Sequence, residues 1–140
     1  MAVLVTALAF DFGTKSIGIA FGQSLTDSAR ELPPLPARDG KPDWQRLQQL
    51  VDTWQPQVLL VGLPLNMDGS DSAFGARARK FGQRLHGRTG LPVEYVDERL
   101  STRAAKEEAA ARGHKGNYAD SPVDSIAARI ILEDWLRARA

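Results

Sequence analysis

Hydrophobic residues along this chain form several short continuous runs, each of which predicts a strand. The first run, Val3 to Asp11, has no helical period and ends on an acid, so it predicts a buried strand. After a turn at residues 12–16, Ile17 to Gly22 predicts a second strand that returns beside the first as a hairpin. Val58 to Leu63 is apolar throughout, which is typical of a central strand covered on both faces. Val93 to Val96 predicts another short strand.

Four other segments predict helices, most of them by the three- and four-residue spacing of their hydrophobic positions and the third by its serine cap and alanine-rich composition. Asp43 can cap the first helix, which ends before Pro56. The second runs from Asp71 to about Gly87, the third from a Ser101 cap to about Arg112, and the last starts near Ser121. The second helix has a basic face and a hydrophobic stripe made of Phe74, Ala78, Phe81 and Leu85.

The segment from Glu31 to Pro42 carries four prolines. Proline lacks a backbone N–H, so this segment predicts an edge strand or an extended loop. The chain is then a hairpin followed by alternating strands and helices. This order predicts an α/β or α+β fold in which a mixed five-stranded sheet has helices on both faces. The α/β class is the one we expect.

The length of 140 residues and the absence of cysteine narrow the range of protein classes. We expect a single domain, residues 1–140, because domains have roughly 100 to 200 residues. A hydrophobic content of 43% and a charged content of 25% exclude disordered and fibrous classes. Without cysteine, no disulfide, zinc–thiolate site or cysteine nucleophile can form. Any metal must be held by carboxylates or by His86 and His114.

The longest apolar stretch, Ala2 to Phe10, is far shorter than the roughly 20 residues needed to span a bilayer. We therefore expect a cytoplasmic protein with no membrane partner. Charge is unevenly distributed, since residues 1–75 hold five Lys/Arg against eight Asp/Glu, whereas residues 76–140 hold 13 against nine. The basic second half indicates an anionic partner such as nucleic acid.

Three acids stand at the ends of predicted elements. Asp11 ends the first strand, Glu98 ends the last strand, and Asp124 lies in the first turn of the last helix. If the first strand is central and the last helix crosses that end of the sheet, the three carboxylates converge. Such a cluster repels itself unless a cation occupies it, and Mg²⁺ and Mn²⁺ prefer oxygen ligands. Two such ions about 4 Å apart would activate a water for attack on a phosphodiester, so hydrolysis of nucleic acid is a candidate reaction.

Structural roles for these acids are also open. Asp11 can be a turn residue, and Asp124 can complement the dipole of the last helix. Asp97 and Glu98 point to opposite faces if the strand persists, so only one can face the site, and Glu98 is favoured. The other acids near predicted turns are interpreted as turn or cap residues: Asp68, Asp71 and Asp120.

Four segments of the chain resemble the motif set of the YqgF family. They are Asp11–Ala20, Val61–Gly69, Asp97–Thr102 and Val123–Ala128, in the order that the family has. The resemblance covers about residues 5 to 136. Members of this family are known as Holliday-junction-resolvase-like proteins and as nucleases that mature the precursor of 16S ribosomal RNA.

The resemblance implies an RNase H-like fold, in which the first strand is central and flanked by its hairpin partner and by the strand ending at Leu63. It also implies a metal-dependent nuclease that hydrolyses RNA and holds Mg²⁺ or Mn²⁺ on Asp11, Glu98 and Asp124. Many RNase H-like nucleases carry the second acid one strand earlier. Val58 to Pro64 contains no acid, so Glu98 has to supply it.

Several basic residues are candidate contacts to nucleic acid. Lys15 adjoins Asp11 and could contact the scissile phosphate, although a polar hairpin turn is an alternative. The others lie on the second helix, beside Glu98 and in the glycine-rich loop, where Lys and Arg can neutralise phosphates and a tyrosine can stack on a base. Solvated surface charge is the alternative for the helix. These candidates are Arg77, Arg79, Lys80, Arg84, Arg99, Arg112, His114, Lys115 and Tyr118.

The leading hypothesis is a nuclease that acts on structured or single-stranded precursor ribosomal RNA. One alternative is cleavage of branched DNA at four-way junctions, which normally requires a two-fold dimer. Another is a non-catalytic RNA-binding role in ribosome assembly. Both a monomer and a homodimer are compatible with the sequence. Residues 11–14 also resemble the first phosphate loop of actin-like ATPases, but those proteins need two such domains.

Overall fold

A computed structural model describes residues 4–26, 28–66, 68–70, 72–98, 107–108, 110–111 and 123–139. For residues 123 and 124 it describes the backbone only. The strands are β1 (Thr6–Asp11), β2 (Ser16–Gln23), β3 (Ser28–Arg38), β4 (Lys41–Pro42), β5 (Val58–Leu63) and β6 (Val93–Asp97). The helices are α1 (Trp44–Trp54), α2 (Ala73–Thr89) and α4 (Val123–Arg139).

The strands form one mixed sheet in the order β4-β3-β2-β1-β5-β6. β1 is antiparallel to β2 and parallel to β5, and β5 is parallel to β6. The predicted hairpin and the predicted central position of the first strand are confirmed. The sheet has six strands instead of the predicted five because Lys41 and Pro42 pair with Arg38 and Ala37. Two residues are too few to produce a hydrophobic pattern in the sequence.

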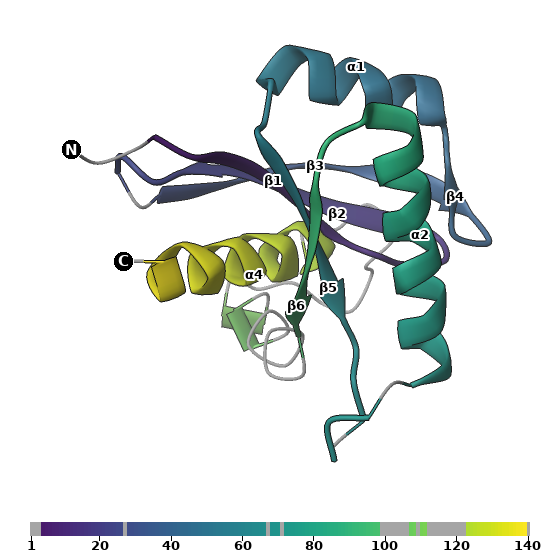
Figure 1. Cartoon of the computed structure of the whole chain (residues 1–140). Helices are drawn as coiled ribbons and strands as arrows, with labels where there is room; N and C mark the ends of the chain where they lie inside the picture. The colour runs from purple at the N-terminus through teal and green to yellow at the C-terminus, as the bar shows by residue number, and fades with distance from the viewer. Residues whose placement is uncertain are drawn as a thin grey trace.

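Helices cover both faces of the sheet, as predicted (Figure 1). α1 and α2 lie on one face, and α4 lies on the other. Successive side chains of β1 point to opposite faces of the sheet. Leu8 and Phe10 pack beneath α1 and α2, whereas Ala7 and Ala9 pack against α4. Residues on alternate sides of a single strand thus belong to two different cores.

Both helices on the first face begin with side-chain caps. Asp43 caps α1 as predicted, since its Oδ1 accepts hydrogen bonds from the backbone N–H of Gln45 and Arg46 at 3.0 and 3.3 Å. Ser72 caps α2 by accepting a hydrogen bond from Gly75 N at 2.8 Å. α2 therefore begins at Ala73, two residues later than predicted.

The predicted hydrophobic stripe of α2 is correct at three of its four positions. Ala78, Phe81 and Leu85 are buried, whereas Phe74 is 36% exposed. Phe74 lies in the first turn, where its ring contacts Phe12 with the centroids 5.3 Å apart. That contact covers only part of the ring.

The proline-rich segment forms β3, and its outer edge pairs with β4 only at Ala37 and Arg38. A bulge interrupts the pairing of its other edge with β2. Ile17 pairs with Leu35 and Ile19 with Leu32, so three steps along β3 face two steps along β2. The bulge contains two consecutive prolines at 33–34, which have no backbone N–H to donate.

A serine from α4 fills this break between β2 and β3. The hydroxyl of Ser125 donates a hydrogen bond to the carbonyl of Leu32 at 2.6 Å and accepts one from the backbone N–H of Ile19 at 3.3 Å. Ser125 is 1% exposed, so water cannot replace these bonds. The first turn of α4 is therefore fixed to both strands at one point.

An arginine provides a second tie between α4 and its surroundings. Arg129 forms ion pairs with Glu31 of β3 at 3.0 Å, with Glu108 at 2.5 Å and with Glu133 at 3.3 Å. Burial lowers the pKa of Arg129, but the Glu108 hydrogen bond and the three carboxylate charges outweigh it and raise this pKa above its usual value. A raised pKa stabilises the fold at every pH below the unfolded value, so this contribution is constant for as long as the three carboxylate partners stay charged.

Some predictions for the second half of the chain lie outside the described residues. The third helix was expected from Ser101 to Arg112, and its residues 107–108 and 110–111 are helical. The Ser121 cap is not described, whereas α4 follows it as predicted. In the part of the chain that the structure covers, no helix is both long and apolar enough to cross a membrane.

Replacing Ser125 with alanine tests the tie between α4 and the bulge. Ser125→Ala leaves the buried Ile19 N–H and Leu32 carbonyl without their hydroxyl partner, so we expect the free energy of unfolding to fall by about 1–3 kcal/mol. Urea denaturation measures this change. Ser28→Ala removes an exposed hydroxyl and should change the free energy by less than about 0.5 kcal/mol. Equal effects of the two substitutions would contradict the role of Ser125.

Candidate active site

Asp11 and Glu98 lie on the sheet face that α4 covers. Strand alternation places Asp11 with Ala9, which packs against α4. The same alternation places Glu98 with Val96, which also packs against α4. β1, β5 and β6 are parallel, and both acids stand at the carboxyl ends of their strands. They therefore lie at the same end of the sheet. The Glu98 N–H donates to the carbonyl of Leu63 at 3.0 Å and extends the strand pairing by one residue.

Gly62 of β5 lies between these two acids in the sheet. Its neighbour Val61 pairs with Phe10, and Gly62 itself pairs with Val96. A Cβ atom at Gly62 would lie 2.5 Å from Glu98 Oε2 and 2.6 Å from Ile131 Cδ1. The Glu98 carboxylate therefore lies in the space that a side chain at position 62 would occupy. Glu98 is only 5% exposed, which distinguishes it from a solvated surface acid.

The amino end of α4 crosses the same end of the sheet. Ser125 is hydrogen-bonded to Ile19, which pairs with Phe10, and Asp11 pairs with the adjacent Gly18. The backbone of Asp124 precedes Ser125 in the first turn of α4. The structure thus brings the backbones of all three predicted acids to the same end of the sheet. It places the side chains of Asp11 and Glu98 on the same face of the sheet.

The other acids near this end of the sheet have different surroundings. Asp97 is exposed, and alternation places it with Tyr95 on the face of α2. Asp68 accepts a hydrogen bond from Ser70 N at 2.9 Å, as expected for a turn residue. Asp71 and Asp120 lie outside the described residues.

The carboxylates of Asp11 and Glu98 fit a hard divalent cation by their donor chemistry. Mg²⁺ is bound by one or two carboxylates and keeps several waters. Among the described side chains, which do not include that of Asp124, no group of three His, Cys, Asp or Glu residues could hold a metal. His86 is exposed on α2, which covers the opposite face of the sheet, and its Nδ1 lies 2.8 Å from the carbonyl of Leu91.

Lys15 is exposed in the turn that joins β1 to β2, four residues after Asp11. Two backbone hydrogen bonds tie this turn to the end of β3 and to the turn that follows it. Ala37 N donates to the Lys15 carbonyl and Gly40 N to the Thr14 carbonyl, both at 2.9 Å. The turn therefore has a fixed position at the end of the sheet.

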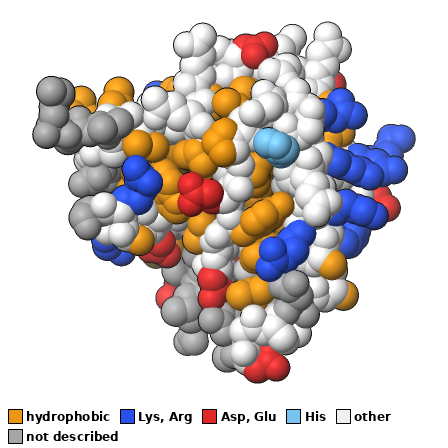
Figure 2. All heavy atoms as spheres, viewed as in Figure 1, with side chains coloured by type: hydrophobic (Ala, Val, Ile, Leu, Met, Phe, Trp, Pro, Cys, Tyr) orange, Lys and Arg blue, Asp and Glu red, His pale blue; other side chains and the backbone are white. Residues whose placement is uncertain are grey.

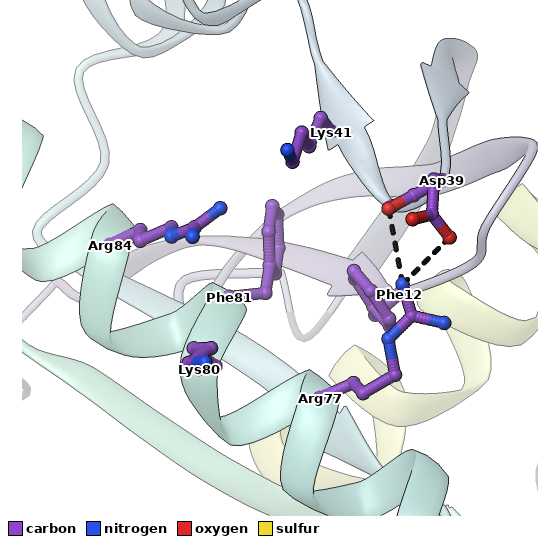
Figure 3. A pocket seen from close by; sticks show the side chains of 8 residues that line it. Phe12, Asp39, Lys41, Arg77, Lys80, Phe81 and Arg84 are labelled. Atoms are coloured by element: carbon purple, nitrogen blue, oxygen red, sulfur yellow. Dashed lines mark hydrogen bonds and ion pairs between the residues drawn. The ribbon is translucent and has the colours of Figure 1, made fainter.

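The basic face of α2 divides into two parts. Arg79 points toward β6, where its guanidinium carbon lies 5.3 Å from the centre of the Tyr95 ring. The remaining predicted contacts on α2 line a pocket of about 200 Å³ on the other side of the helix (Figure 3). Its lining residues are Phe12, Asp39, Gly40, Lys41, Arg77, Lys80, Phe81 and Arg84. The other predicted contacts lie outside the described residues: Arg99, Arg112, His114, Lys115 and Tyr118.

This pocket begins one residue from Asp11 but on the opposite face of the sheet. Phe12 follows Asp11 and packs in the core beneath α1 and α2. Arg77 lies over the Phe12 ring at 6.0 Å and donates hydrogen bonds to the side chain and carbonyl of Asp39 at 3.0 and 3.1 Å. Asp39 is the single acid among the residues that line the pocket.

Cations of α2 follow one another at helical spacing with no acid between them. Arg77, Lys80, Arg84 and Arg88 stand three or four residues apart. Each like-charged neighbour at this spacing destabilises a helix by about 0.2–0.5 kcal/mol. Figure 2 shows the Lys and Arg side chains gathered over α2, at the right-hand side of the view. This surface has a concentrated positive charge.

Gly62, Ser125 and Lys41 were not predicted from the sequence as site residues. Gly62 and Ser125 lie within two of the segments that resemble the YqgF motifs, and this position in a motif is the only sign of their role in the sequence. Lys41 had no signal, because only the pairing of β4 with β3 brings it beside α2.

Solved structures with the same fold define the class of protein. Thermus thermophilus RuvC in complex with a Holliday junction substrate matches with a TM-score of 0.58 at 18% identity, over 96% of this chain and 95% of that one. The fowlpox virus Holliday junction resolvase matches with a TM-score of 0.55 at 12% identity, over 96% and 99% of the two chains. The fold is that of the RuvC-like, RNase H-like proteins, as the motifs implied.

Sequence comparison then assigns the family. Residues 5–138 match the family model RuvX, described as "Holliday junction resolvase". A Saccharophagus degradans protein named "Putative pre-16S rRNA nuclease" is 59% identical over 132 residues, 94% of this chain and 93% of its own. A Chromohalobacter salexigens protein of the same name is 62% identical over 128 residues, 91% and 86% of the two chains. The chain belongs to the RuvX family, also called YqgF, and is a nuclease by that membership.

Filling the space at Gly62 tests the arrangement of the acids. Gly62→Ala places a methyl group against the Glu98 carboxylate, so we expect loss of cleavage and a fall of about 1–3 kcal/mol in the free energy of unfolding. Cleavage assays and urea denaturation measure the two effects. Gly87→Ala in α2 meets no atom within 4 Å and should stabilise the protein by up to about 1 kcal/mol. Full activity of Gly62→Ala would contradict the placement of Glu98.

Proposed function

We propose that this protein uses Mg²⁺ or Mn²⁺ to hydrolyse phosphodiester bonds in RNA, with Asp11, Glu98 and Asp124 at its metal site. The observation that carries the proposal is the buried carboxylate of Glu98, which lies over Gly62 on the same face and at the same end of the sheet as Asp11. The names of the curated relatives support the precursor of 16S ribosomal RNA as its substrate. Such a role would place the protein in the cytoplasm, as a monomer or a homodimer.

Some residues of this chain would bind the metal and others would bind the substrate. Bound divalent ions would activate the attacking water and stabilise the leaving oxygen. Glu98 is buried and lies against Gly62, so its carboxylate has little side-chain freedom to lose when a cation binds. Asp11 presents its carboxylate from the end of the central strand, and Lys15 in the adjoining turn would contact a phosphate of the RNA.

Replacing Asp11 by asparagine removes one charge and keeps the shape of the side chain. We expect Asp11→Asn to lower the cleavage rate by at least about a hundredfold, more than the loss of an outer metal partner does. The assay uses precursor 16S RNA with Mg²⁺ and with Mn²⁺. Binding of the same RNA in EDTA should be unchanged, because the substitution removes none of the Lys and Arg side chains that bind phosphates. Undiminished cleavage by Asp11→Asn would refute the site.

A matched pair of substitutions distinguishes the two neighbouring acids of β6. Glu98→Gln should abolish cleavage, because this carboxylate faces α4 and the proposed metal. Asp97→Asn changes the adjacent acid, which faces the other side of the sheet, and should retain most of the activity. Stabilisation by Mn²⁺ in thermal unfolding should be lost in Glu98→Gln and kept in Asp97→Asn. The reverse pattern would assign the metal to Asp97.

Cleavage of four-way DNA junctions is a second candidate, favoured by the description of the RuvX family and by the RuvC-like fold. Symmetric cleavage of a junction normally requires a two-fold dimer. A four-way DNA junction is therefore assayed beside precursor 16S RNA and single-stranded RNA, with the oligomeric state measured in the same buffer. Cleavage of RNA by a monomer supports the first proposal, and paired nicks in the junction by a dimer support the second. RNA binding without cleavage of any substrate would favour a non-catalytic role.

A further inference from the structure

A groove between α1 and α2 runs along the face of the sheet that is turned away from Asp11 and Glu98. It consists of three adjoining hollows of about 200, 560 and 380 Å³. The first two share Lys41 and Arg84, and the last two share Trp44 and Arg88. We define the basic groove by its five cations, which are Lys41, Arg77, Lys80, Arg84 and Arg88.

Aromatic residues beneath the groove hold two of its cations in place. The guanidinium carbon of Arg88 lies 4.5 Å from the centre of the Trp44 ring, and Trp44 stacks on Phe81 with the ring centroids 5.8 Å apart. Arg77 lies over Phe12 in the same way. Because both phenylalanines are buried core residues, the cations stand on a floor that cannot move far.

Most of the positive charge in the groove is not neutralised. Asp39 is the one acid along it, and it is paired with Arg77. Within the described part of the chain, Lys41, Lys80, Arg84 and Arg88 form no ion pair with a carboxylate. Figure 3 shows Lys41 and Arg84 on either side of Phe81, with Lys80 on the next turn of α2. A row of neighbouring cations without acids favours a ligand with several negative charges.

We propose that the basic groove binds the phosphate backbone of single-stranded RNA that flanks the scissile bond. This proposal rests on the proposed function and adds a second contact region to it. The groove starts at Phe12, next to Asp11, and the exposed Lys15 lies in the turn at the end of the sheet. A strand that leaves the acid site passes this turn and then follows the cations of α2.

The geometry selects a flexible strand as the ligand. Arg77 and Arg88 are 11 residues apart on α2, which corresponds to about 17 Å at the 1.5 Å rise of an α-helix. To reach the groove from Asp11, the RNA has to turn around the end of the sheet, from one face to the other. A flexible single strand makes this turn more easily than a stiff duplex, since the persistence length of double-stranded DNA is about 50 nm. A second copy of the chain is also disfavoured, because two basic grooves would face each other.

The test compares two RNAs of shared sequence, one that covers only the cleavage position and one with single-stranded flanks on both sides. Binding is measured in EDTA at several salt concentrations. We expect the wild-type protein to bind the flanked RNA more tightly, and K80Q/R84Q to lose most of this advantage. The slope of log K against log salt for the flanked RNA should become smaller by about 1.4, because each phosphate contact contributes about 0.7 for a single strand.

A control variant removes two cations that lie outside the groove. Arg46 on α1 and Arg139 on α4 are exposed and line none of the three hollows. R46Q/R139Q changes the net charge by the same amount and should keep the advantage of the flanked RNA. Hybridising complementary strands to the flanks should remove that advantage from the wild-type protein, to the level of K80Q/R84Q.

Two results would overturn the proposal. K80Q/R84Q could bind both RNAs as the wild type does, or it could weaken the binding of both RNAs equally. Failure of the nuclease proposal is a different result. In that case the wild-type protein cleaves no RNA with Mg²⁺ or Mn²⁺, while the flank-dependent binding in EDTA still supports the groove.

Discussion

The hydroxyl of Ser125 joins one helix to two strands at the point where those strands cannot bond to each other. The consecutive prolines of β3 open a break opposite Ile19, and the serine supplies both the acceptor for Ile19 and the donor for Leu32. A buried N–H and carbonyl without these bonds would destabilise the fold, so the first turn of α4 has one favourable position. The end of the sheet that carries Asp11 is covered as a result.

The sheet also separates opposite charges. Adjacent residues of a strand face opposite sides, so Asp11 and Phe12 belong to different layers, as do Glu98 and Asp97. The cations of the basic groove therefore stand across a layer of buried side chains from the carboxylates and do not neutralise them. A formal net charge of +1 conceals this arrangement, in which one face can hold cations while the other holds phosphates.

Much of the fold could be predicted because its signals are local. The apolar run of β5, the Asp43 cap of α1 and the acids at strand ends follow from neighbouring residues in the sequence. The two-residue strand β4, the bulge in β3 and the space at Gly62 depend on pairing between distant segments, which no local pattern records. Arg79 shows the same limit, since helical position alone did not show that the side chain of Tyr95 would draw it away from the basic groove.

The bonds of Ser125 connect residues that are 93 and 106 positions apart in the chain. Contacts between such distant residues form late in folding, because a long loop has to close before they contribute any stability. During synthesis, the first strands leave the ribosome long before residue 125 does, and domains fold as units. A nascent chain of this protein therefore lacks the helix over the end of β1 until translation has passed α4, and its acidic end is assembled only after that.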